Sequence, residues 1–304
     1  MARFSSLAGV YAAAVTPLTD SDKIDSSSFP RYLGFLAERG CHGALLLGTT
    51  GEGPSFAHHE RVELMRVALQ VREEHAGFRL LAGTGTPSLE ESIANTRAAF
   101  DLGLDGVVVL PPYYYRKASD DGLFAWFSRL IRSAVPDGGA LLGYHIPAIS
   151  GVGLSLDLIS RLKDAFPDRF AGIKDSSGSL EFARELGARF GKDLLILNGN
   201  DRLLSASLSA NGSGCITALA SLCSPYLRRV WEAHQRRQSD AVAQSILDAA
   251  RSVMDQYPPA PPLIKALLAV KHGFPLWSVR PPLLNLPEEW VVHIAAELET
   301  IFHA

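Results

Sequence analysis

The sequence predicts an α/β fold, namely a (β/α)8 TIM barrel followed by a C-terminal helical region. Short apolar runs alternate with longer segments of helical periodicity roughly every 30 residues, a pattern typical of parallel strands joined by helical crossovers. Eight such units lie in residues 1–236, which is the number that closes a barrel. A doubly wound open sheet is the structural alternative.

The eight strands are expected to begin at Val10, His42, Phe78, Asp105, Ala140, Phe170, Asp193 and Gly212. Helices are expected over residues 28–38, 59–74, 89–102, 121–134, 156–166, 180–190, 203–209 and 225–236. Strands such as residues 106–110 are apolar at every position, as expected where one face fills a barrel and the other meets helices.

Three further helices are expected after the barrel, over residues 239–255, 263–271 and 288–302. Proline-rich linkers over residues 258–262 and 280–282 separate them, and proline disfavours helix in the residue ahead of it. The chain is therefore expected to divide into a catalytic barrel, residues 1–236, and a helical region, residues 237–304.

Composition argues against several classes of partner. The net charge of −3 is spread over the 304 residues without a basic block, which disfavours nucleic acid and membrane surfaces. The three cysteines fit neither a zinc site nor a disulfide framework, and no segment approaches the roughly 20 apolar residues that cross a bilayer. A cytoplasmic protein is the expectation.

Lys174 ends an apolar strand and is followed by small polar residues. Burial disfavours the charged form of a lysine, and a neutral amine is a nucleophile that forms a Schiff base with a carbonyl. Tyr144 ends the preceding strand and is a possible proton carrier. Both residues fall at the carboxyl ends of strands, where barrel active sites lie. The structural alternatives are a lysine paired with a carboxylate and a core phenol bonded to backbone.

Residues 48–53, which read Gly-Thr-Thr-Gly-Glu-Gly, follow the second strand. Their glycines permit turns that aim backbone N–H groups and two hydroxyls at one carboxylate or phosphate. The alternative interpretation is an ordinary glycine-rich turn that ends the strand. Three consecutive tyrosines, residues 113–115, cannot all enter one core, so at least one faces a cleft or a partner. Residues 198–201 and 211–214 are either phosphate sites or turns.

No cofactor is expected. His58 and His59 lack the spacing that places two histidines on one helical face, and neither nucleotide-binding glycine motif occurs. The only group implied at the site is a covalent lysine imine with substrate, without metal or nucleotide.

The chain resembles the dihydrodipicolinate synthase and N-acetylneuraminate lyase family of Schiff-base barrels over nearly its whole length. Residues 48–52 resemble the family's GTTGE loop, residues 144–147 its YNxP motif and residues 172–175 its GxKD/E lysine strand. The resemblance implies that Lys174 forms an imine with a 2-keto acid such as pyruvate, and that Tyr144 relays protons.

The same resemblance implies roles for further residues. Thr49 and Thr50, with Gly48, hold the keto acid's carboxylate, while Ile216 lines the pyruvate pocket and Gly199 belongs to the substrate site. Tyr114 matches a tyrosine that joins the proton relay across a subunit interface, which implies a homo-oligomer, either a dimer or a tetramer.

Departures from the family pattern bear on the substrate. Ile149 stands where lysine-pathway synthases carry an arginine that binds the aldehyde's carboxylate. Sialate lyases have Asp-Glu where this chain has Asp201 and Arg202, and a serine where it has Ala218. His145 replaces an asparagine and has no assigned role.

The leading hypothesis is a lyase or aldolase that cleaves or forms the carbon–carbon bond between pyruvate and an aldehyde, on a 2-keto-3-deoxy sugar acid. Asn200, Asp201 and Thr217 would meet substrate hydroxyls. The alternatives are 4-hydroxy-tetrahydrodipicolinate synthase, with another cation replacing the missing arginine, a 2-keto-3-deoxy acid dehydratase, and a barrel that only senses a keto acid.

Overall fold

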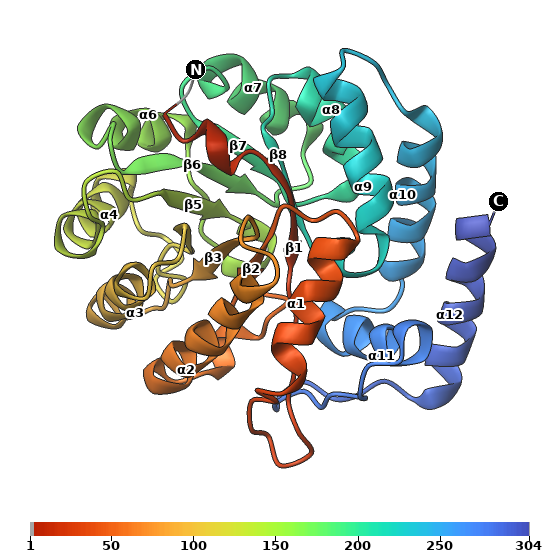
Figure 1. Cartoon of the computed structure of the whole chain (residues 1–304). Helices are drawn as coiled ribbons and strands as arrows, with labels where there is room; N and C mark the ends of the chain where they lie inside the picture. The colour runs from red at the N-terminus through yellow and green to blue at the C-terminus, as the bar shows by residue number, and fades with distance from the viewer. Residues whose placement is uncertain (1–2, 304) are drawn as a thin grey trace.

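A computed structural model describes residues 3–303, which form a closed barrel of eight parallel strands surrounded by helices (Figure 1). The strands are β1 (Gly9–Ala13), β2 (Gly43–Leu46), β3 (Arg79–Gly83), β4 (Gly106–Val109), β5 (Leu141–His145), β6 (Phe170–Asp175), β7 (Leu195–Asn198) and β8 (Gly214–Thr217). Consecutive strands pair in order, and β8 pairs with β1 in parallel. The predicted barrel is confirmed, and the open-sheet alternative is wrong because both edges of the sheet are used in closure.

The helices around the barrel are α1 (Ser28–Glu38), α2 (His58–Ala68), α3 (Leu89–Asp101), α4 (Asp120–Ala134), α6 (Leu156–Ala165), α7 (Leu180–Phe190), α8 (Leu204–Ser209) and α9 (Ala220–Gln235). A short α5 (Pro147–Ser150) and the 3-10 turns η1 (Ser5–Leu7), η2 (Gly53–Ser55), η3 (Leu69–Glu73) and η4 (Asp201–Leu203) complete this part. Four helices begin at a serine whose hydroxyl accepts a backbone N–H of the first turn, namely Ser88, Ser119, Ser155 and Ser179.

Side chains of the strands divide between two cores. One set fills the barrel interior and includes Tyr11, Leu45, Leu81 and Ile216. The alternate positions, such as Val10 and Leu46, pack outward against the helices. Burial of both faces explains why the strands read as continuous apolar runs.

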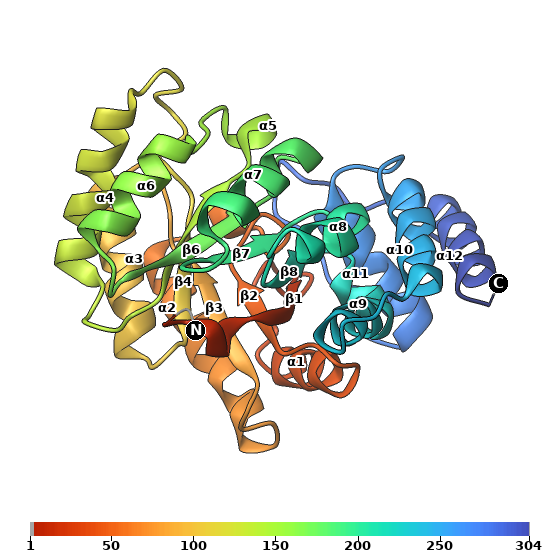
Figure 2. The same ribbon diagram turned by 90° about the horizontal axis from the view of Figure 1, so that it is seen from above.

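The C-terminal region consists of α10 (Ala241–Met254), α11 (Ala260–His272) and α12 (Glu288–His303). Figures 1 and 2 show these three helices beside α9 on one side of the barrel, where α10 packs on α9 and α12 packs on α10 and α11. Within residues 3–303, no helix is long and apolar enough to span a membrane.

Two helix starts differ by three or more residues from the sequence-based prediction. The last barrel helix begins at Ala220 rather than at Pro225, and its backbone departs from helical geometry at Cys223, which produces a kink. Proline was expected to keep the segment around residues 258–262 outside the next helix. Instead Pro261 and Pro262 form its first turn, where the missing N–H groups have no intrahelical partner to lose.

Candidate active site

Lys174 and Tyr144 lie side by side at the carboxyl end of the barrel. They are partners in the register of β5 and β6, and each residue is at most 5 % exposed. The Lys174 Nζ atom lies 3.8 Å from the centroid of the Tyr144 ring. An amine and a phenol thus share one buried site at the carboxyl end of the barrel.

The Tyr144 hydroxyl also contacts the loop after β2, because it lies 3.3 Å from the Thr49 hydroxyl oxygen. Burial by itself would raise the pKa of the Tyr144 phenol. The charge and hydrogen bond of Lys174 and hydrogen bonds from Thr49 and Ser176 outweigh burial, and the pKa lies below its ordinary value. A lowered pKa suits a group that must give up and regain its proton. Ser176 was not among the predicted site residues, although it stands only two positions after Lys174.

The loop between β2 and α2 is held tightly around Thr49 and Thr50. Thr50 and Gly48 are buried, while Thr49 is exposed in this chain. The Thr16 hydroxyl donates to the Gly51 carbonyl at 2.7 Å, and backbone N–H groups of Glu52 and Gly53 bond back into the loop. The loop therefore has a fixed shape before any ligand arrives.

Arg61 of α2 reinforces this loop from outside. Its guanidinium is 3 % exposed and donates to three backbone carbonyls, those of Gly53 at 2.5 Å, Phe56 at 3.0 Å and Gly83 at 3.2 Å. Burial lowers the pKa of Arg61. This buried cation ties the loop after β2 to the end of β3.

Two further predicted residues border the Lys174–Tyr144 pair. Ile216 belongs to the same apolar cluster of the barrel interior as Tyr144. Gly199 approaches the strand end that carries Lys174 so closely that a Cβ atom there would lie 2.0 Å from the Ser176 Oγ. Only glycine fits this position without displacing its neighbour.

Tyr114 and Ile149 lie on the surface of the chain. Tyr114 is 77 % exposed and packs edge-on against Tyr115, and Ile149 on α5 is 62 % exposed. Within one chain they are therefore surface groups, in contrast to the buried Lys174 and Tyr144.

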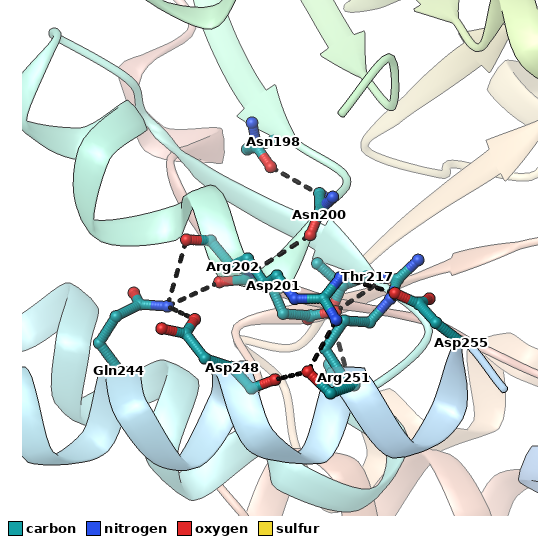
Figure 3. A network of polar contacts seen from close by, with 11 residues as sticks. Asn198, Asn200, Asp201, Arg202, Thr217, Gln244, Asp248, Arg251 and Asp255 are labelled. Atoms are coloured by element: carbon teal, nitrogen blue, oxygen red, sulfur yellow. Dashed lines mark hydrogen bonds and ion pairs between the residues drawn. The ribbon is translucent and has the colours of Figure 1, made fainter. Parts of the chain in front are cut away.

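Asp201 is fully buried, and its Oδ2 lies 3.1 Å from Arg251 Nη1 of α10 (Figure 3). Burial raises the pKa of this carboxyl, and the attraction of Arg251 only partly offsets the rise. The ion pair ties the end of β7 to the C-terminal region. Arg251 lies far along the chain, and nothing in the sequence indicates this pairing.

The rest of the loop after β7 makes turn contacts with itself and with α10. Asn198 Oδ1 accepts the N–H of Asn200 at 2.7 Å, and Asn200 Oδ1 accepts the N–H of Arg202 at 3.2 Å. The Gln244 amide of α10 donates to the Asp201 carbonyl at 3.0 Å (Figure 3). These bonds favour the turn interpretation of residues 198–201 over a phosphate site.

His145 points to the outer side of the barrel. Its Nδ1 accepts the N–H of Leu154 at 2.9 Å, and its ring stacks on Phe182 of α7 at 4.5 Å between centroids. Burial lowers the pKa of His145 although Asp175 on the next strand opposes the shift. The imidazole is thus a neutral acceptor that fastens the chain after α5, which gives this residue a structural account.

Comparisons with known proteins place the whole chain among similar sequences and structures. The model of the dihydrodipicolinate synthetase family matches residues 6–301. A relative from Chloroflexus aurantiacus, described as an uncharacterized DapA-like lyase, is 37 % identical over 96 % of both chains. The 4-hydroxy-tetrahydrodipicolinate synthase of Listeria monocytogenes is 31 % identical over 96 % of this chain and 98 % of its own.

A solved structure gives the same result. The crystal structure of dihydrodipicolinate synthase from Agrobacterium tumefaciens superposes with a TM-score of 0.85 and 31 % identity, covering 97 % of this chain and 99 % of that one. Among residues 3–303, no three His, Cys, Asp or Glu side chains gather as they would around a metal ion.

Proposed function

The chain belongs to the dihydrodipicolinate synthetase family, and from this we propose that it cleaves or forms the bond between pyruvate and an aldehyde in a 2-keto-3-deoxy sugar acid. The family consists of carbon–carbon lyases and synthases of the class I aldolase type that act on pyruvate-type keto acids. The observation that carries the proposal is the Lys174 amine against the Tyr144 ring, with the phenol bonded to Thr49.

In the proposed first step, the neutral Lys174 amine attacks the C2 carbonyl carbon of the keto acid and forms a carbinolamine. Tyr144 gives its proton to the C2 hydroxyl, which leaves as water, so that a protonated imine and the Tyr144 phenolate remain. Thr49, Thr50 and Gly48 hold the carboxylate next to this carbon. Such positioning lowers the activation barrier by an amount on the order of several kcal/mol.

In the cleavage direction, the Tyr144 phenolate takes the proton of the C4 hydroxyl. The C3–C4 bond breaks, its electron pair moves through C3 to the imine nitrogen, and the aldehyde leaves. Protonation of the resulting enamine at C3 and hydrolysis of the imine release pyruvate and restore the Lys174 amine. The condensation direction reverses these steps.

The side chains expected around the aldehyde support the sugar acid as the substrate. Ile149 offers no charge to a second carboxylate, whereas Asn200 and Thr217 carry groups that bond hydroxyls. A hydroxylated aldehyde therefore fits this chain better than aspartate semialdehyde. Asp201, which is buried beside Arg251, is also proposed to bond a hydroxyl of the substrate.

4-Hydroxy-tetrahydrodipicolinate synthase is the second candidate, because relatives of about one-third identity carry that name. Incubation with pyruvate and aspartate semialdehyde separates the two, since only a synthase forms the cyclic product. A 2-keto-3-deoxy acid dehydratase would release water and keep the carbon chain intact, which product analysis distinguishes from aldehyde release.

Borohydride reduction in the presence of pyruvate tests the imine directly. We expect a pyruvate-sized adduct on Lys174 by peptide mass mapping, and none in Lys174→Ala. Lys271→Ala on α11, where Lys271 forms an ion pair with Glu299 of α12, serves as the control and should retain the adduct. A folded wild-type protein that gives no adduct with pyruvate or with any 2-keto-3-deoxy acid would refute the proposal.

A further inference from the structure

The chain buries a second lysine, Lys265 of α11, at a distance from the reacting pair. Its side chain is 1 % exposed, and its Nζ lies 2.5 Å from Oε1 of Glu52, whose side chain is fully buried. Buried ion pairs give little net stability, because desolvation cancels much of the attraction, and in some proteins they specify one arrangement of the chain instead. The role of this pair therefore depends on which segments of the chain it joins.

Glu52 is the residue that closes the loop of residues 48–52. Its backbone has a φ of 54°, a left-handed conformation that is unfavourable for a residue with a side chain. Both carboxylate oxygens are occupied, since Oε2 accepts the backbone N–H of Arg280 at 2.9 Å. Lys265 in turn also donates to the Ser278 carbonyl at 2.6 Å. One side chain of the loop is thus joined to α11 and to the segment that follows it.

Direct contacts lead from Glu52 to the reacting groups. The Glu52 N–H donates to the Thr49 carbonyl at 3.2 Å, and the Thr49 hydroxyl lies 3.3 Å from the Tyr144 hydroxyl. Tyr144 in turn contacts the Lys174 amine. A shift of Glu52 therefore moves Thr49, whose hydroxyl helps to lower the Tyr144 pKa.

We propose that Glu52 and Lys265 are positioning residues for keto acid capture, and that through them the C-terminal helical region sets the geometry of the active site. The inference rests on the proposed function, because it assumes that the loop of residues 48–52 holds the substrate's carboxylate. Neither residue touches the reacting atoms, so their effect is exerted through Thr49 and Tyr144.

The experiment measures borohydride trapping over a range of pyruvate concentrations, which yields the half-saturating concentration and the maximal extent of adduct on Lys174. This readout needs no aldehyde. The variants are Glu52→Gln, Lys265→Met and the double variant Glu52→Gln/Lys265→Met. Lys271→Met is the matched control, because Lys271 lies on the same helix and forms an ion pair with Glu299 of α12, remote from the loop.

We expect Glu52→Gln and Lys265→Met to raise the half-saturating concentration about tenfold or more, since small misplacements of binding groups are costly. Lys265→Met leaves Glu52 buried and unpaired, so it can fail to fold. The double variant removes both charges and should regain stability. It should nevertheless keep the raised half-saturating concentration, because no charged anchor holds the loop.

A purely structural role gives a different result. In that case the half-saturating concentration follows thermal stability, returns to the wild-type value in the double variant, and rises equally in a similarly destabilised Lys271→Met. Any one of these three results overturns the inference. If the wild type itself shows no adduct, the proposed function is refuted. If the wild type is trapped and the variants have the same half-saturating concentration, only the positioning role is refuted.

Discussion

At the scale of single residues, one hydroxyl influences how readily Tyr144 gives up its proton. Thr49 bonds the phenol, and together with Lys174 and Ser176 it outweighs the effect of burial on the Tyr144 pKa. Replacing Thr49 by valine keeps the shape and removes the donor. The pKa of Tyr144 should then rise, because the phenolate loses a hydrogen bond.

The exchange of pyruvate methyl protons with deuterium oxide measures this effect by NMR, since exchange requires the enamine. If the Tyr144 phenolate is the base, exchange rises with pH through the Tyr144 pKa, and Thr49→Val shifts that limb to higher pH. Thr300→Val, an exposed substitution on α12, should leave the profile in place. An unshifted limb in Thr49→Val would mean that Tyr144 does not control this step.

The adjacency of the proposed catalytic pair could be predicted from the sequence because each residue lies at the end of a strand within a short motif. Lys174 and Tyr144 needed only the strand assignments and the rule that barrel sites lie at strand ends. The partners Lys265 and Arg251 could not be predicted, because each reaches its carboxylate from a helix distant in the chain. A lone lysine within the apolar run of α11 was the available signal.

At the scale of elements, the junction of β1 and β2 depends on a neutral histidine. The Nδ1 of His42 accepts the N–H of Val10 at 2.9 Å. Burial lowers the pKa of His42 to about 4, and Arg228 and Arg79 lower it further, while Glu232 opposes them. Because the unfolded chain binds this proton near an ordinary pKa of about 6.5, acid favours unfolding. Stability from His42 is complete above that value and is lost as the pH falls towards 4.

His42→Asn should keep an acceptor for Val10 and remove the titration. Between pH 7 and pH 4.5, we expect the melting temperature of this variant to fall by about 3 °C or more less than that of the wild type. The same substitution at the exposed His59 of α2 serves as the control, which should fall as the wild type does. Equal falls in all three proteins would contradict the assignment.

Helix boundaries show where sequence patterns lose precision. Most barrel helices begin and end within a few residues of the predicted positions, because apolar periodicity and serine caps both mark them. Proline gave a wrong helix start at two places. In α11 it lies inside the first turn, and in α9 the helix continues back past Pro225 to Ala220 through a kink at Cys223.

At the scale of the whole molecule, the barrel could be predicted because the chain has eight strand–helix units, the number that closes a barrel, whereas burial of both strand faces is shared with a doubly wound open sheet. The docking of α10 to α12 beside the barrel could not, since it depends on long-range contacts such as Arg251 with Asp201 and Lys265 with Glu52. Those contacts make the C-terminal region part of the site's support.

The surface of the chain carries exposed aromatic groups on the loop after β4. Tyr114 and Tyr115 are both more than 70 % exposed after β4, and Ile149 is exposed after β5. Tyrosine is enriched in protein interfaces, where its ring is buried and its hydroxyl is bonded. We therefore expect two copies of the chain to meet over these residues, and the family resemblance implies that Tyr114 then joins the partner's proton relay.

Sedimentation equilibrium should show a dimer or tetramer, and Tyr114→Ala should raise the dissociation constant about tenfold or more. Val242→Ala, which shortens a similarly exposed side chain on α10, should not. If Tyr114 also acts in the relay, exchange of pyruvate methyl protons should fall as dilution separates the subunits, because each site then loses a proton carrier. A strictly monomeric protein with full exchange activity would exclude this role, whereas an oligomer whose activity survives Tyr114→Ala would limit Tyr114 to assembly.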